Sequence, residues 1–467
     1  MEEKVDVAVI GAGSAGLYAL AQVVRTTDSY VLIDGGELGT TCARVGCMPS
    51  KALIQVAEDF HRRKLFPREG IEGGDGLTVS GSDVMEHVQG LRDIFVDKVL
   101  STSTDDMGDE FIEGHARFLD RNLLQVGERR IRAKRIVIAT GTSPIVPGDW
   151  KAFGDRILTT DEIFELEELP QSLAVIGLGV IGLELGQALQ RLGVEITGID
   201  QLETIGNIDD PEVNKLAQQL IGKDMPLWLG HPASIEEAGD GRLKVSAGER
   251  SVSVDKVLVA IGRAPNLSGL DPEKAGIVLK AGGVPDFDPG TMQIGDLPLF
   301  IAGDVTMDRQ LLHEAADEGR IAGINAAAEK PVAFRRKTPL TITFSDPNIV
   351  MVGKRYSQLD LDNTLIGSVS LGMLGRALIM GRNKGMLRLY ADRAEGRLLG
   401  ASILAPHGEH LGHLLNWCIE QRLTILQMVR MPFYHPVLEE AIQPVLRDLV
   451  RQSDWHSGPY PPDLEVL

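Results

Sequence analysis

The chain has 467 residues, 43% of them hydrophobic, which suits about three globular domains of roughly 150 residues each. Its 47 basic and 66 acidic side chains give a formal charge of −19, which repels phosphate backbones and anionic membranes and argues against nucleic-acid binding. No apolar run reaches the roughly 18 residues of a membrane helix, and the first residues resemble no targeting signal, so we expect a cytoplasmic protein.

The first unit along the chain is a strand, a glycine-rich loop and a helix. The apolar strand is residues 5–10, the helix extends to about residue 24, and the next strand, residues 30–33, ends in Asp34. The loop glycines are Gly11, Gly13 and Gly16. In such a β-α-β unit a pyrophosphate approaches the helix N-terminus and the acid bonds a ribose hydroxyl. We therefore predict a dinucleotide site, with a tight glycine turn in another α/β fold as the alternative.

Two cysteines follow this unit. Cys42 and Cys47 can cycle between dithiol and disulfide and so transfer two electrons. Residues five apart in a helix exceed the roughly 4.4–6.8 Å between Cα atoms that a disulfide allows, so we expect Cys42 outside a helix that begins near Cys47. Pro49 suits the first turn of that helix, and the helix N-terminus favours a Cys47 thiolate. A structural disulfide or two unrelated buried thiols are the alternatives.

The β-α-β pattern occurs a second time. Residues 173–176 form the strand, residues 194–199 the next one, and Asp200 lies 23 positions after the first glycine, as Asp34 does in the first unit. The second set of glycines is Gly177, Gly179 and Gly182. Two units imply two dinucleotides, and a flavin is the carrier that fits between a cysteine pair and a soluble nicotinamide. We assign FAD to the first unit, which lies beside the cysteines in the sequence, and the nicotinamide to the second. NAD is favoured over NADP, because Asp200 would repel a 2′-phosphate.

The C-terminal part is predicted to be α+β. Expected strands are residues 340–344, 364–369, 386–390 and 397–404, residues 346–348 read as a turn, and expected helices are 411–421 and 437–450. His435 precedes a proline at a helix entrance, with Glu440 about one turn inside. Histidine titrates in the useful range and a carboxylate can fix its tautomer, so the two could form an acid–base pair. In a chain without the two cysteines, the His435-Pro436 dipeptide would more often mark only the start of a helix.

Several other residues are expected to be structural. His407, His410 and His413 have helical spacing, but no cysteine or second ligand set lies near them in the sequence, so we predict no metal site. Cys418 is expected to be a packed helix residue.

Further motifs connect these features to a known family. They are Ala139-Thr140-Gly141, residues 260–266 with Gly262, residues 300–304 ending in Asp304, and residues 435–440. With the two glycine loops and the cysteine motif, the chain resembles the two-dinucleotide-binding flavoprotein disulfide reductases over almost its whole length. Within that family it is most similar to the dihydrolipoyl dehydrogenases.

The resemblance implies roles for individual residues. Asp304 would bind the flavin ribityl chain, and Gly141 would lie against the flavin dinucleotide. Lys51 would lie beside the isoalloxazine and pair with Glu184. Cys42 would exchange with the substrate and Cys47 would contact the flavin. His435 and Glu440 would form the acid–base pair and would come from the partner subunit of a homodimer.

The resulting expectation is an α/β protein with two Rossmann-like domains and a C-terminal α+β dimerisation domain. We expect residues 1–147 to begin the FAD domain, 148–266 to form the NAD domain, 267–336 to complete the FAD domain, and 337–467 to form the interface. The implied function is oxidation of a dihydrolipoyl group with NAD⁺. An NADH-dependent reductase of another disulfide stays open, because Arg44, Phe433 and Tyr434 depart from the usual pattern. A scaffold subunit without activity is a further alternative.

Overall fold

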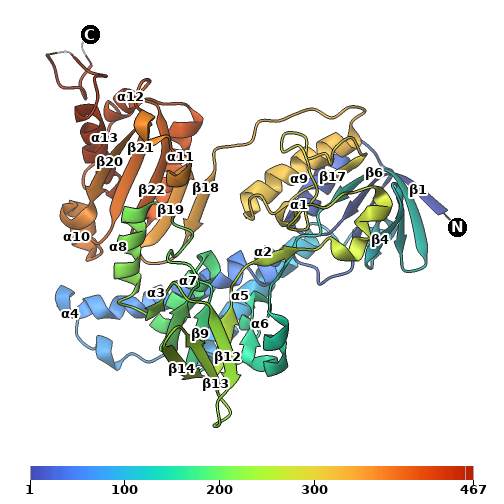
Figure 1. Ribbon diagram of the computed structural model, residues 1–467, viewed down its shortest axis with the longest axis horizontal. Helices are drawn as coiled ribbons and strands as arrows, with labels where there is room; N and C mark the ends of the chain where they lie inside the picture. The colour runs from blue at the N-terminus through green and yellow to red at the C-terminus, as the bar shows by residue number, and fades with distance from the viewer. Residues whose placement is uncertain (1, 458, 466–467) are drawn as a thin grey trace.

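The computed structural model describes residues 2–457 and 459–465. Figure 1 shows a sheet with α1 and α9 at one side, a second sheet around β9 below, and a third around β22 at the other side. A long extended segment after α9 leads to β18 and so to the third sheet. Among the described residues, no helix is both long and apolar enough to cross a membrane.

The first sheet has seven strands in the order β3-β2-β1-β6-β5-β4, with β17 also paired to β6. Pairing is parallel from β3 to β6 and for β17, and antiparallel among β4, β5 and β6. The strands are β1 (Glu2–Ile10), β2 (Tyr30–Asp34), β3 (Phe111–Glu113), β4 (Ala116–Asp120), β5 (Leu123–Val126), β6 (Arg129–Ile138) and β17 (Leu299–Ile301). Because β17 lies some 160 residues after β6, two distant stretches of chain share one core.

Helices α1 (Ser14–Val23) and α9 (Leu312–Ala327) pack closely against each other beside this sheet. A Cβ atom added to Gly319 would lie 2.2 Å from the Ala15 carbonyl oxygen, and one added to Gly323 would lie 2.3 Å from that of Ala19. Only glycine allows this approach of two backbones. The fit brings the start of α9 beside the first glycine loop.

The cysteines lie on a helical excursion from the first sheet. It comprises α2 (Thr41–Arg44), α3 (Cys47–Arg62), α4 (Phe66–Glu69) and α5 (Gly81–Ser101). Leu53 and Ala57 of α3 share a hydrophobic core with Leu183 and Leu185 of α7 (Val180–Arg191), so the excursion packs on the second sheet's helix. Helix α3 begins at Cys47 as predicted, and Cys42 lies outside it, in the short helix α2.

The second sheet is parallel, in the order β11-β10-β9-β15-β8. Its strands are β8 (Ile157–Leu158), β9 (Ser172–Ile176), β10 (Glu195–Ile199), β11 (Leu227–Trp228) and β15 (Lys256–Val259). The same stretch of chain also forms three helices, α6 (Thr160–Ile163), α7 and α8 (Pro211–Ile221). It also forms a small antiparallel sheet of β12 (Ala233–Glu237), β13 (Leu243–Ala247) and β14 (Arg250–Val254). A two-stranded link, β7 (Thr142–Pro144) with β16 (Arg263–Pro265), joins it to the first sheet.

The third sheet is antiparallel, in the order β18-β19-β22-β21-β20. Its strands are β18 (Leu340–Thr343), β19 (Asn348–Gly353), β20 (Thr364–Ser370), β21 (Met386–Asp392) and β22 (Leu398–Ala405). The sequence prediction missed β19. This strand is internal and buried over nearly its whole length, so it shows no alternation of apolar and polar residues, and the turn residues before it hid its start.

The C-terminal helices are α10 (Gly375–Met380), α11 (Gly408–Glu420), α12 (Ile425–Val429) and α13 (Ile442–Arg451). The predicted helix 437–450 was wrong at its start, because a 3₁₀ turn, Leu438–Ala441, precedes α13. Pro444 explains the break, since a proline ring clashes with the carbonyl four residues earlier in an α-helix. The two predicted Rossmann-like domains and the α+β C-terminal part are confirmed, whereas the bounds of the four predicted segments stay a prediction.

The contact between α1 and α9 can be tested with one methyl group. Gly323→Ala should lower the thermal unfolding midpoint, because overpacking typically costs about 1–3 kcal/mol. Gly90→Ala is the matched control, since no atom lies within 4 Å of a Cβ at this exposed site in α5. The control should keep or raise the midpoint, because alanine is the better helix former by about 1 kcal/mol. Equal midpoints for both variants would contradict the close packing.

Candidate active site

In the first glycine loop, two glycines press against nearby backbone and a third faces open space. A Cβ on Gly11 would lie 2.3 Å from the Ala139 carbonyl oxygen, and one on Gly16 would lie 1.8 Å from that of Gly11. At Gly13, the residue before α1, no atom lies within 4 Å of an added Cβ. The loop is therefore tight on its protein side and open at the helix N-terminus, which fits a pyrophosphate.

The second glycine loop repeats this arrangement. A Cβ on Gly177 would lie 2.4 Å from the Ala260 carbonyl oxygen, and one on Gly182 would lie 1.9 Å from that of Gly177. At Gly179 the nearest atoms belong to the Asn207 side chain, at 3.7 and 4.0 Å. Asn207 was not predicted from the sequence, because it is remote from the loop along the chain.

The two acidic residues at the strand ends hold these loops. The Ala12 N–H donates to Asp34 Oδ2 at 2.5 Å, and the Leu178 N–H donates to Asp200 Oδ2 at 2.6 Å. The other oxygen of each carboxylate accepts a further backbone N–H, from Gly36 and Leu202. A carboxylate offers about four acceptor sites, so both acids can still accept from a ribose hydroxyl.

Cys42 and Cys47 are free thiols that interact with each other. A hydrogen bond from Cys42, with help from the charge of Lys51, lowers the pKa of Cys47 to about 7, although desolvation opposes the shift. The pKa of Cys42 is raised because its thiol is the donor of that bond and is partly buried. Cys47 is thus the thiolate of the pair, which agrees with its position at the start of α3.

Lys51 connects the cysteines to the rest of the molecule. Its Nζ donates to Glu184 Oε2 at 2.7 Å and lies 4.9 Å from the ring centroid of Phe344. The other oxygen of Glu184 accepts the Phe344 N–H at 2.8 Å. Glu184 is almost fully buried on α7, so one carboxylate joins the redox helix, the second sheet's helix and the end of β18. The family resemblance of the sequence implied the Lys51–Glu184 pair. The sequence analysis did not predict that Phe344 lies beside it.

Asp304 follows β17 at the edge of the first sheet. Burial raises its pKa, and Arg263 partly opposes this shift. Gly303, just before it, donates its N–H to the buried Glu318 of α9 at 2.8 Å. Glu318 also accepts from Arg336 at 2.7 Å, so α9 fixes the turn that presents Asp304. The sequence analysis missed Glu318, which is an acid within a helix with no local sign of its role.

Gly141 and Gly262 lie on the link between the two parallel sheets. Both have positive φ angles, 65° and 124°, which glycine adopts without strain. The Asn266 N–H donates to the Gly141 carbonyl oxygen at 3.0 Å, and the Asn266 side chain donates to Thr140 at 3.1 Å.

His435 and Glu440 form the predicted pair. The His435 Nδ1 lies 2.8 Å from Glu440 Oε1, and Glu440 Oε2 accepts the Val437 N–H at 3.0 Å. The hydrogen bond with His435 lowers the pKa of Glu440. The histidine side chain is 77% exposed, and Figure 1 shows the neighbouring α12 and α13 far from α2. The segment between α12 and α13 therefore lies apart from the α2 helix of the same chain.

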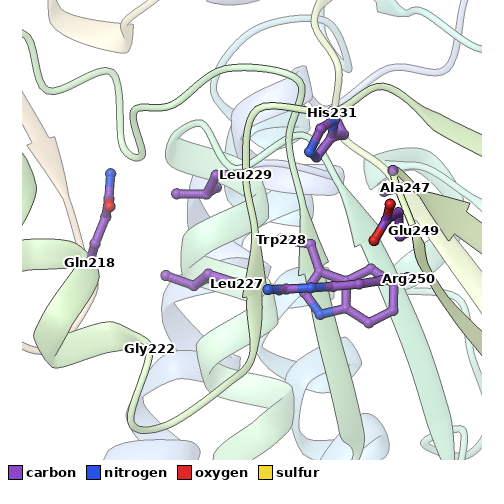
Figure 2. Close-up of a pocket in the computed structure, with 10 residues that line it drawn as sticks. Gln218, Gly222, Leu227, Trp228, Leu229, His231, Ala247, Glu249 and Arg250 are labelled. Carbon is purple, nitrogen blue, oxygen red and sulfur yellow. The ribbon is translucent and has the colours of Figure 1, made fainter.

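A separate cavity of about 730 Å³ lies along β11 (Figure 2). The cavity lies near Asp200, because the Asp200 N–H donates at 2.9 Å to the carbonyl oxygen of Trp228, which lines the cavity. None of the predicted site residues lines it. Its lining is Gln218, Gly222, Leu227, Trp228, Leu229, His231, Ala247, Gly248, Glu249 and Arg250.

Comparison with known families accounts for this arrangement. Residues 5–319 match the pyridine nucleotide-disulphide oxidoreductase family, and residues 340–446 match its dimerisation domain. The chain belongs to this family. Its members use FAD and NAD(P)H, which agrees with the two open glycine loops, and the dimerisation domain implies a homodimer.

Proteins similar to this chain are named as different enzymes of the family. A dihydrolipoyl dehydrogenase of Haloferax volcanii is 30% identical over 96% of this chain and 97% of that protein. A mercuric reductase of Shigella flexneri is 30% identical over 94% of this chain and 79% of that protein. Among solved structures, RclA of Escherichia coli has a TM-score of 0.82 at 22% identity and covers 96% of this chain and 99% of its own. The last similarity concerns the fold alone.

The thiolate assignment can be tested on the reduced protein. Alkylation of Cys47, followed by mass spectrometry across pH, should show a midpoint near 7. Lys51→Met removes a positive charge that stabilises the thiolate, so the midpoint should rise by roughly one unit. Lys51→Arg keeps the charge and is the matched control, and Cys418, whose pKa burial raises, is the slow internal reference. A midpoint that is the same in all three proteins would rule out the role of Lys51.

Proposed function

We propose that the protein is an FAD-dependent dithiol–disulfide oxidoreductase that oxidises a dihydrolipoyl group with NAD⁺. The observation that carries this proposal is the Cys42–Cys47 pair at the start of α3, with a stabilised Cys47 thiolate tied through Lys51 to Glu184. A pair with one nucleophilic and one leaving thiol suits disulfide exchange.

The cysteines perform the exchange with substrate. A substrate thiolate attacks Cys42 of the Cys42–Cys47 disulfide, the S–S bond breaks, and Cys47 leaves as the thiolate. The second substrate thiol then attacks the mixed disulfide at the substrate sulfur, which releases the oxidised substrate disulfide and the Cys42 thiol. Two electrons thus pass from substrate to the cysteine pair. FAD, when bound, supplies the two-electron relay between that dithiol and the nicotinamide.

His435 is the proposed acid–base residue. A dithiol must lose a proton before it attacks Cys42, and a histidine with a carboxylate partner is suited to accept it. Glu440 holds Nδ1 of the ring, which leaves Nε2 free for the substrate. Because His435 is exposed and remote from the cysteines of its own chain, we infer that it completes the site of the other subunit.

The choice of lipoyl substrate rests on the match to the dihydrolipoyl dehydrogenases and on the absence of further thiols. The chain has three cysteines, and Cys418 is partly buried on α11, so the 467 residues hold no second exchange pair of the kind a mercuric reductase would use. Arg44, which pairs with Glu37 beside the cysteines, and the exposed Tyr434 depart from the usual pattern. A different disulfide substrate is the competing outcome of the experiment below.

The activity test compares substrates with site variants. The FAD-loaded protein should oxidise dihydrolipoamide with NAD⁺ faster than it turns over glutathione disulfide, thioredoxin or Hg²⁺ in the presence of NADH. Cys42→Ser should abolish dithiol oxidation, and His435→Gln should reduce it by about 10²- to 10⁴-fold.

Reduction of the bound flavin by NADH in a single turnover is the control, because it needs no proton transfer at His435. This rate should be unchanged in His435→Gln. If another disulfide is preferred, the lipoyl assignment fails. If both rates fall together in the variant, the acid–base role fails.

The coenzyme preference is a separate test. Asp200 is buried at the end of β10, and its carboxylate would face a 2′-phosphate with like charge. We therefore expect kcat/KM for NADH to exceed that for NADPH by at least about tenfold, measured with one disulfide substrate. Equal values would contradict the assignment of NAD.

A further inference from the structure

Three potential metal ligands meet where β22 gives way to α11. His407 is the residue before the helix, and Glu409 and His410 lie in its first turn. His407 has a left-handed backbone with φ 48° and ψ 37°, which is unusual for a residue with a side chain. The His407 ring stacks against the His410 ring with 6.3 Å between centroids.

The donor atoms of these side chains form a compact triangle. His407 Nδ1 lies 3.8 Å and His410 Nε2 lies 3.7 Å from Glu409 Oε1, and all three donor atoms lie within 4.8 Å of one another. Tetrahedral zinc has bonds of about 2.0–2.2 Å, which places its ligands roughly 3.4 Å apart. The two distances to Glu409 Oε1 exceed this spacing by a few tenths of an ångström, and a rotation of the exposed His410 ring can shorten the distance between the two histidines.

Glu409 is the least satisfied member of the group. Its Oε2 is buried and has no hydrogen-bond partner among the residues that the structure describes, and its Oε1 lies 3.7–3.8 Å from the histidine nitrogens, which is too long for a good hydrogen bond. Buried carboxylate oxygens are normally paired, and an unpaired one calls for an explanation. A cation held between Glu409 Oε1 and the two histidines would neutralise this carboxylate, and a second bond from the same ion would give Oε2 its partner.

We propose that His407, Glu409 and His410 bind a divalent transition-metal ion of the Zn²⁺ class. Two imidazoles and one carboxylate are ligands that such ions accept, whereas Ca²⁺ and Mg²⁺ prefer oxygen alone. His410 is 70% exposed, so water can occupy the fourth position. Of the nearby charges, Glu58 of α3 favours a cation and Arg382 opposes it.

The site is distinct from the redox chemistry. None of its three residues belongs to the cysteine pair, the glycine loops or the His435–Glu440 pair. A bound ion would cross-link the left-handed turn at His407 to the first turn of α11. It should therefore stabilise the C-terminal part of the chain by mass action, in proportion to the logarithm of ion concentration over Kd.

His413 provides a matched control. It lies on the same helix one turn further on, but its Nδ1 contacts the Glu409 carbonyl oxygen at 2.8 Å and it is not among the three ligands. Removal of His413 thus deletes a neighbouring histidine without deleting a proposed ligand.

The experiment is calorimetric titration of the FAD-loaded, oxidised protein with ZnCl₂ after treatment with a chelator. Oxidation keeps Cys42 and Cys47 from binding the ion as thiolates. We expect one site per chain, affinity reduced at least tenfold in His410→Ala and in Glu409→Gln, and wild-type affinity in His413→Ala. Added ZnCl₂ should raise the thermal midpoint of wild type and of His413→Ala, but not of the other two variants.

Either of two results would overturn the metal site itself, and a third would reject its ligands. One is the absence of saturable binding to the wild-type protein. The other is wild-type affinity in His410→Ala, which changes an exposed side chain and should fold normally, as its midpoint without metal will show. Equal losses in His413→Ala and His410→Ala would also reject the assigned ligands.

Discussion

The arrangement of the whole molecule depends on the buried carboxylate of Glu184. It accepts Lys51 of the redox helix with one oxygen and the Phe344 N–H with the other, so three sheets are tied at one point. A buried charge is stable only when it is paired and hydrogen-bonded, and both conditions are met here. The hydrogen bond from Cys42 and the charge of Lys51 lower the pKa of Cys47 while Glu184 opposes this shift, so the lysine that joins the sheets also supports the thiolate. Structure and chemistry therefore share one ion pair.

The two dinucleotide loops are built in the same way. In each dinucleotide-binding unit, glycines without Cβ let the loop press against nearby backbone. The acid at the strand end accepts one N–H from the loop and a second from the turn that follows the acid. The helix N-terminus is left open to a pyrophosphate. Glu318 and Arg336 add a second support on the first sheet, where α9 holds the turn before Asp304. These contacts lie within the chain itself, so they set the geometry of the sites before any nucleotide binds.

The C-terminal part carries the proposed acid–base pair. His435 and Glu440 are correctly paired but exposed, and the segment that carries them lies far from the cysteines of the same chain. The family's dimerisation domain gives a reason for this separation, because a second subunit can bring the pair to the site. The histidine cluster at the start of α11 shows that this part also holds groups outside the redox reaction.

The amino-acid sequence by itself determined the family, both dinucleotide loops and the start of α3, because these depend on local spacing: glycines at a strand end, an acid 23 residues on, and a proline after a cysteine. It failed for β19, whose uniform burial leaves no alternation, and for the helix broken by Pro444. Tertiary structure alone decided the roles of Phe344, Glu318 and Glu409. Each acts through a partner brought close by folding, or through the lack of one, and neither condition leaves a periodic pattern in the sequence.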